Sequence, residues 1–80
     1  MDLVVDVKYR ILQLVRENNI SVNKLAEDSG LARSSLKNII YGKSKSPKLR
    51  TIKILCDGLG ITLAEFFDTK EFNELEQEIK

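Results

Sequence analysis

The sequence is poor in the residues that carry most metal-binding and catalytic chemistry. Its 80 residues include no histidine and no tryptophan, and only one cysteine, Cys56, and one proline. Without histidine, neither a zinc finger with histidine ligands nor a histidine-based catalytic group can be assembled. One cysteine cannot form an intramolecular disulfide, and Cys56, set among isoleucines and leucines, is predicted to be a core residue. We expect neither an enzyme nor a protein with a metal or other cofactor.

Long apolar runs are also missing. No stretch approaches the roughly 18 apolar residues that span a membrane. The first six residues are acidic, and their apolar run is too short for a signal peptide. The composition, 42% hydrophobic and 31% charged, is that of a soluble globular protein. We expect one small domain in the cytoplasm, without membrane contact.

Negative charge is absent from the middle of the chain. No Asp or Glu occurs between Asp28 and Asp57, and this stretch holds Arg33, Lys37, Lys43, Lys45, Lys48, Arg50 and Lys53. The net charge of +1 hides the segregation, since residues 1–60 carry +5 and residues 61–80 carry −4. Attraction to phosphates is local and is screened over about 8 Å at physiological salt. The basic stretch therefore predicts a polyanionic partner.

The first half of the chain predicts three helices. Apolar residues at helical spacing indicate an amphipathic helix over residues 6–17. Ser21 suits the N-cap of a second helix, and Gly30 supplies the positive φ of the turn that ends it, with Leu31 as the anchor in the core. A third helix is expected over residues 33–41 and ends at Gly42.

The third helix has two unlike faces when its residues are placed about 100° apart. The apolar arc is predicted to face the core and contains Ser35, Leu36, Ile39 and Ile40. The polar arc contains Arg33, Ser34, Lys37, Asn38 and Tyr41. A basic loop follows this helix.

The second half predicts two or three more helices. Ser46 and Pro47 are expected to cap and begin a fourth helix, whose buried face holds Leu49, Ile52, Leu55, Cys56 and Leu59. Thr62 and Glu65 have the spacing of a capping box, which predicts a short fifth helix with Phe66 and Phe67.

We place the globular domain at residues 1–68 and an acidic amphipathic tail at residues 69–80. A further short helix in the tail would align Phe72, Leu75 and Ile79. This apolar stripe is either a seam for a dimer or partner, or it folds back on the core beside Phe66.

Together these features resemble the Cro/C1-type (phage-repressor or XRE-like) helix-turn-helix family over residues 6–68. The matching residues are Leu25-Ala26, Gly30-Leu31, Leu36, Ile39, Gly42-Lys43, Pro47, Thr51, Leu59-Gly60-Ile61 and Phe66-Phe67. The resemblance implies an all-α, compact five-helix domain of the lambda-repressor type, with the helix-turn-helix at helices two and three. It also implies a DNA-binding transcriptional regulator, most often a repressor.

In this family the third helix enters the major groove, while the start of the second helix and the loop after the third hold phosphates. By this resemblance, the base-reading positions are Arg33, Ser34, Lys37 and Asn38. Arg33 suits guanine and Asn38 suits adenine. The positions that contact the DNA backbone are Ser21, Val22, Asn23, Tyr41, Lys43 and Lys45. Alternatively, Arg33 and Lys37 are ordinary solvated surface.

Three of the matching positions depart from the family pattern. Val22 replaces the usual Gln at the start of the second helix, so Asn23 is the substitute for that side-chain contact. Ala32 stands where Ser or Thr normally caps the recognition helix, which weakens the cap by about 1 kcal/mol. Tyr41 stands where Asn is common.

Two functions fit the sequence. The first is a sequence-specific regulator that binds double-stranded DNA as a homodimer, with half-sites about one helical turn apart. The second is a protein-binding module, antitoxin-like or an adaptor, because fold does not fix function. The acid-free stretch favours DNA, since a protein-only adaptor has no need to exclude carboxylates from that surface. No small-molecule ligand is indicated.

Overall fold

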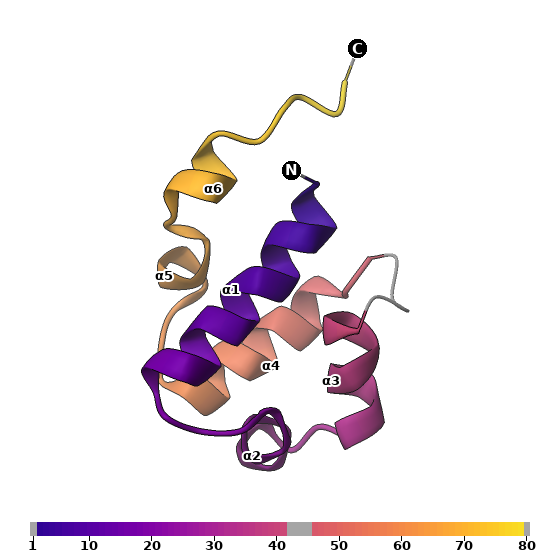
Figure 1. The fold of residues 1–80 in the computed structure, drawn as a ribbon, viewed down its shortest axis with the longest axis vertical. Coiled ribbons are helices and arrows are strands. Elements are labelled where there is room, and N and C mark those ends of the chain that lie inside the picture. Colours follow the sequence, from indigo (N-terminus) through magenta and orange to yellow (C-terminus); the bar gives the residue numbers. More distant parts are fainter. Residues whose placement is uncertain (1, 42–45, 80) are drawn as a thin grey trace.

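Six helices make up most of residues 2–41 and 46–79, which the computed structural model describes. They are α1 (Leu3–Glu17), α2 (Val22–Ser29), α3 (Arg33–Ile40), α4 (Leu49–Leu59), α5 (Leu63–Phe67) and α6 (Lys70–Asn73). In Figure 1, α1 crosses in front of α4 at the centre of the view, and α2 and α3 lie at its lower end. The described residues contain no strand. The expected all-α domain with a helix-turn-helix at α2 and α3 is confirmed.

The first five helices share one hydrophobic core. Its buried members are Val7, Ile11, Leu14, Val15, Leu25, Ala26, Leu36, Ile39, Ile40, Ile52, Leu55, Cys56 and Phe66. Cys56 is fully buried, as predicted, and burial raises the pKa of its thiol. Arg10 of α1 also holds α5 in place, because its guanidinium donates hydrogen bonds to the carbonyls of Phe66 (2.7 Å) and Glu65 (2.8 Å).

Local signals fix both ends of α2. The Ser21 hydroxyl oxygen accepts a hydrogen bond from the amide of Lys24 (3.0 Å). Gly30 has φ +68°, a conformation that residues with a Cβ rarely adopt. The amide of Leu31 then donates to the carbonyl of Ala26 (2.9 Å), and Leu31 packs against the core. The predicted cap, turn and anchor are all confirmed, and together they bring the chain directly into α3.

The most extensive contact between two helices joins α2 to α4. A Cβ placed on Gly58 would overlap the Ser29 hydroxyl and would lie 3.2 Å from the Ser29 Cβ. The Ser29 hydroxyl is buried and has no hydrogen-bond partner among the described residues. Gly58, the second-to-last residue of α4, therefore allows α2 to approach α4 closely because it has no side chain.

Two helices begin at unexpected residues. α1 starts at Leu3, three residues before the prediction, because the Asp2 carboxylate accepts a hydrogen bond from the amide of Val4 (3.0 Å) and caps the helix. α4 starts at Leu49 after Lys48, which provides no side-chain cap. The predicted roles of Ser46 and Pro47 in starting α4 are wrong, since both line an apolar groove beside α1 instead.

Two further expectations about helix faces and ends are wrong. Leu49 is 66% exposed, because it is the first residue of α4 and lies before the turn that packs on the core. α3 ends at Ile40, so Tyr41 is its C-cap rather than its last residue. Gly42, which was expected to end the helix, lies outside the described residues.

The C-terminal segment is only partly helical. The capping box of Thr62 and Glu65 is confirmed, with both hydrogen bonds at 3.0 Å. Thr69 caps α6, but α6 ends at Asn73, so the predicted helical stripe does not form. Phe72 folds back, with its ring centroid 6.2 Å from that of Phe66, whereas Ile79 is 87% exposed.

Replacing Gly58 by alanine tests the close approach of α2 and α4. Alanine favours a helix over glycine by about 1 kcal/mol, but overpacking a core contact costs about 1 to 3 kcal/mol. We expect Gly58→Ala to lower the free energy of unfolding by about 1 kcal/mol in urea denaturation. In a Ser29→Ala background the cost should shrink, because the overlapping hydroxyl is gone. An equal cost in both backgrounds would show that the two residues do not limit the approach.

Candidate nucleic-acid interface

The core residues of α3 determine which of its side chains face solvent. Leu36, Ile39 and Ile40 are buried, and the opposite side of the helix is exposed. The exposed residues include all four predicted base-reading positions, Arg33, Ser34, Lys37 and Asn38. They therefore form one continuous polar face, which we call the α3 face. Ser35, expected on the core side, is also exposed, and it borders a shallow hollow between α3 and α4.

The polar groups of the α3 face are not engaged within the described part of the chain. The ion pairs among the described residues join Lys24 to Asp28 (3.1 Å) and Lys53 to Asp57. Neither Arg33 nor Lys37 takes part in one. The hydrogen bond and charge of Asp28 raise the pKa of Lys24. The nearest acidic residue before α3 in the sequence is thus already paired with a lysine of its own helix.

The start of α2 offers backbone amide groups and the side chain of Asn23. The Ser21 hydroxyl is occupied as the helix cap, and Val22 is partly buried against the core. Asn23 is exposed. The first amides of an eight-residue helix such as α2 have no acceptor within the helix, and they carry the positive end of its dipole.

The segment after α3 brings further polar groups close to Asn38. Tyr41 is 68% exposed. Lys43 and Lys45 lie outside the described residues. The hollow beside Asn38 is lined by Ser35, Ile39, Ser46, Pro47, Lys48 and Thr51. Sequence reasoning missed Thr51 as a neighbour of this site, because Thr51 belongs to α4 and only the tertiary fold places it beside α3. It also placed Ser35 on the core side of α3.

Residues 10–71 match the model of the Cro/C1-type HTH DNA-binding domain. The chain belongs to the Cro/C1-type helix-turn-helix family. A solved structure, "Crystal structure of the prophage Lp1 protein 11", is similar with a TM-score of 0.82 and 31% identity. The match covers 92% of this chain and 97% of that chain. No curated protein sequence matches the chain significantly.

The family assignment identifies the domain as DNA-binding, with α2 and α3 as its helix-turn-helix. Within the described residues, no helix is long and apolar enough to cross a bilayer, and no cluster of acidic or cysteine side chains is arranged to hold a metal ion.

The N-terminus of α3, the helix that corresponds to the family's recognition helix, has no side-chain cap. Ala32 has the extended backbone of an N-cap residue, φ −65° and ψ 139°, but makes no side-chain hydrogen bond. Its backbone therefore already has the geometry that a capping serine would need.

Adding a capping side chain at this position should stabilise the domain. We expect Ala32→Ser to raise the free energy of unfolding by about 1 kcal/mol, which corresponds to an increase in Tm of about 4 to 8 °C for a domain of this size. The matched control is Ala64→Ser, an exposed position inside α5. Equal thermal shifts for the two variants would show that Ala32 does not limit the helix end.

Proposed function

We propose that this protein is a sequence-specific transcriptional regulator that binds double-stranded DNA as a homodimer and represses by occupying its site. The observation that carries the proposal is the α3 face. Its polar side chains are exposed, and no Asp or Glu occurs from residue 29 to residue 56. A helix of this kind fits the major groove of B-DNA, which is about 12 Å wide.

Base reading is assigned to Arg33, Ser34, Lys37 and Asn38. Arg33 is the first residue of α3, and in this motif the N-terminal residues of the recognition helix contact base edges. Its guanidinium can donate two hydrogen bonds to guanine, and the Asn38 amide can pair with adenine. Lys37 lies one turn after Arg33, where it reaches guanine or a phosphate. Ser34 is short and contacts a base directly or through water.

Phosphate binding is assigned to both flanks of the α3 face. On one flank, the amides of Ser21, Val22 and Asn23 stand at the start of α2, where a helix favours an anion. On the other flank are the Tyr41 hydroxyl and the charges of Lys43 and Lys45. Lys48 extends this second flank, because it is exposed and borders the same hollow as Asn38.

Binding a protein instead of DNA is the second candidate function. The exposed Ile79 and the apolar groove beside α1 support a protein contact. Neither feature lies on the α3 face. A protein contact at that place is therefore compatible with DNA binding and does not replace it.

The salt dependence of binding tests the electrostatic part of the proposal. Affinity for duplex DNA should fall steeply with salt, because each neutralised phosphate releases counterions. We expect Lys43→Ala and Lys45→Ala each to reduce the slope of log K against log salt by roughly one unit. Fluorescence anisotropy over a salt series measures this slope. Lys70→Ala, on α6, is the control and should leave it unchanged; a protein that binds no random duplex at low salt would rule out a DNA regulator.

Selection from random DNA tests the assignment of Arg33. Arg33→Ala should relax the preference at one base pair of the selected site, at a cost of about 1 to 3 kcal/mol, and should largely preserve nonspecific affinity. Arg50→Ala is the matched control, since Arg50 is an exposed arginine on α4. The control should select the wild-type motif. Identical motifs from all three proteins would contradict a base-reading role for Arg33.

A further inference from the structure

An apolar groove lies between the beginnings of α1 and α4. Leu3, Val4 and Val7 form one side, Pro47, Leu49 and Ile52 form the other, and Phe67 lies between them. We call this the α1–α4 groove. Leu3 is 43% exposed and Leu49 is 66% exposed, although leucine is among the residues most often buried. Two large apolar side chains thus stand in solvent at the edge of one groove.

The residues after α6 provide an apolar side chain without a partner at the same end of the molecule. This tail, residues 74–79, leaves α6 and extends beyond the N-terminal end of α1 (Figure 1). Ile79 is 87% exposed, and the hollow beside it is lined by Gln77, Glu78 and Ile79. The tail therefore ends in an apolar group that does not enter the groove of its own chain.

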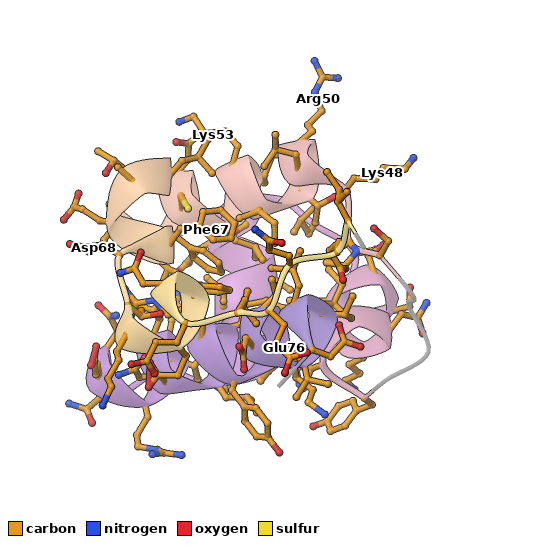
Figure 2. The ribbon with its side chains drawn as sticks, turned by 90° about the horizontal axis from the view of Figure 1, so that it is seen from above. Lys48, Arg50, Lys53, Phe67, Asp68 and Glu76 are labelled. Carbon is orange, nitrogen blue, oxygen red and sulfur yellow. The ribbon has the colours of Figure 1, made fainter. Side chains whose placement is uncertain are left out.

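The charges at the start of α4, on one side of the groove, and along the tail are opposite. Lys48 and Arg50 flank Leu49 in the sequence, and both are exposed. Figure 2, which looks down on this end of the molecule, shows both side chains projecting outward from the start of α4. The tail carries Glu74, Glu76 and Glu78. An apolar contact bordered by opposite charges favours one partner and one register.

We propose that the tail of one copy docks in the α1–α4 groove of a second copy, with Ile79 against Leu3 and Leu49, and Glu76 and Glu78 facing Lys48 and Arg50. The groove and the tail lie at the same end of the molecule. Two copies that meet end to end around a two-fold axis can therefore exchange tails reciprocally, which gives a closed and self-complementary interface.

This dimer rests on the proposed function, to which it adds the contact that joins the two subunits. It also places that contact beside the DNA interface. Ser46 and Pro47 line both the α1–α4 groove and the hollow next to Asn38.

Sedimentation of the full-length chain without DNA, over a range of concentrations, tests the dimer. The wild type should dimerise, and Ile79→Ser and Leu49→Ser should each raise the dimer dissociation constant at least tenfold. Both positions are exposed, so circular dichroism and thermal melting should show folded monomers. Tyr9→Ser is the matched control, since Tyr9 is 52% exposed and lies outside the groove, and it should leave the constant unchanged.

A charge exchange tests the register. The double variant Lys48→Glu and Arg50→Glu should weaken the dimer at least tenfold, and adding Glu76→Lys and Glu78→Lys should restore it. A wild type that stays monomeric would overturn the proposal. If Ile79→Ser then lowered the stability of that monomer, the tail would dock within its own chain. A dimer unaffected by Ile79→Ser and Leu49→Ser, or a charge exchange without rescue, would also overturn it. Dimers that form normally but bind no duplex DNA would instead contradict the proposed function.

Discussion

The close approach of α2 to α4, where Ser29 lies against Gly58, is the contact on which the geometry of the DNA-binding surface depends. α2 packs most extensively on α4, and Gly30 and Leu31 then carry the chain into α3 within three residues. A Cβ on Gly58 would overlap the Ser29 hydroxyl and crowd the Ser29 backbone, so the two helices could not keep this close approach. The position of α3 thus depends on the seating of α2 on α4 as well as on the buried residues of α3 itself.

The chemistry of the α3 face follows from the same packing. Leu36, Ile39 and Ile40 are drawn into the core by the apolar surface they bury, and this leaves Arg33, Lys37 and Asn38 in solvent. The absence of carboxylates from residues 29–56 keeps the surroundings of these side chains attractive to phosphate. In the proposed function, stability and recognition use opposite sides of one eight-residue helix, so polar substitutions on its exposed side are expected to change DNA preference at little cost to the fold.

Local chemistry in the sequence predicted the features that depend on a few neighbouring residues. The Ser21 cap, the Gly30 turn and the capping box of Thr62 and Glu65 all need only a short segment to form. The positions of Pro47 and Leu49 and the fold of residues 69–79 were predicted wrongly. They depend on tertiary contacts with α1 and the phenylalanines, which no local pattern contains. The polar face of α3 was predictable from its periodicity, whereas the position of Thr51 beside Asn38 depends on the tertiary fold. The contact roles of Arg33, Ser34, Lys37 and Asn38 stay predictions, since exposure alone is common to any solvated helix face.

Mapping the DNA contact directly on the folded protein is the most decisive measurement. Amide chemical shifts in the NMR spectrum of the labelled chain should change, on titration with a selected duplex, along residues 33–41 and at the first turn of α2. Residues of α5 and α6, on the other side of the core, should change little. Shift changes concentrated on the α1–α4 groove or the tail, with the α3 face unaffected, would show that this helix does not enter the DNA groove.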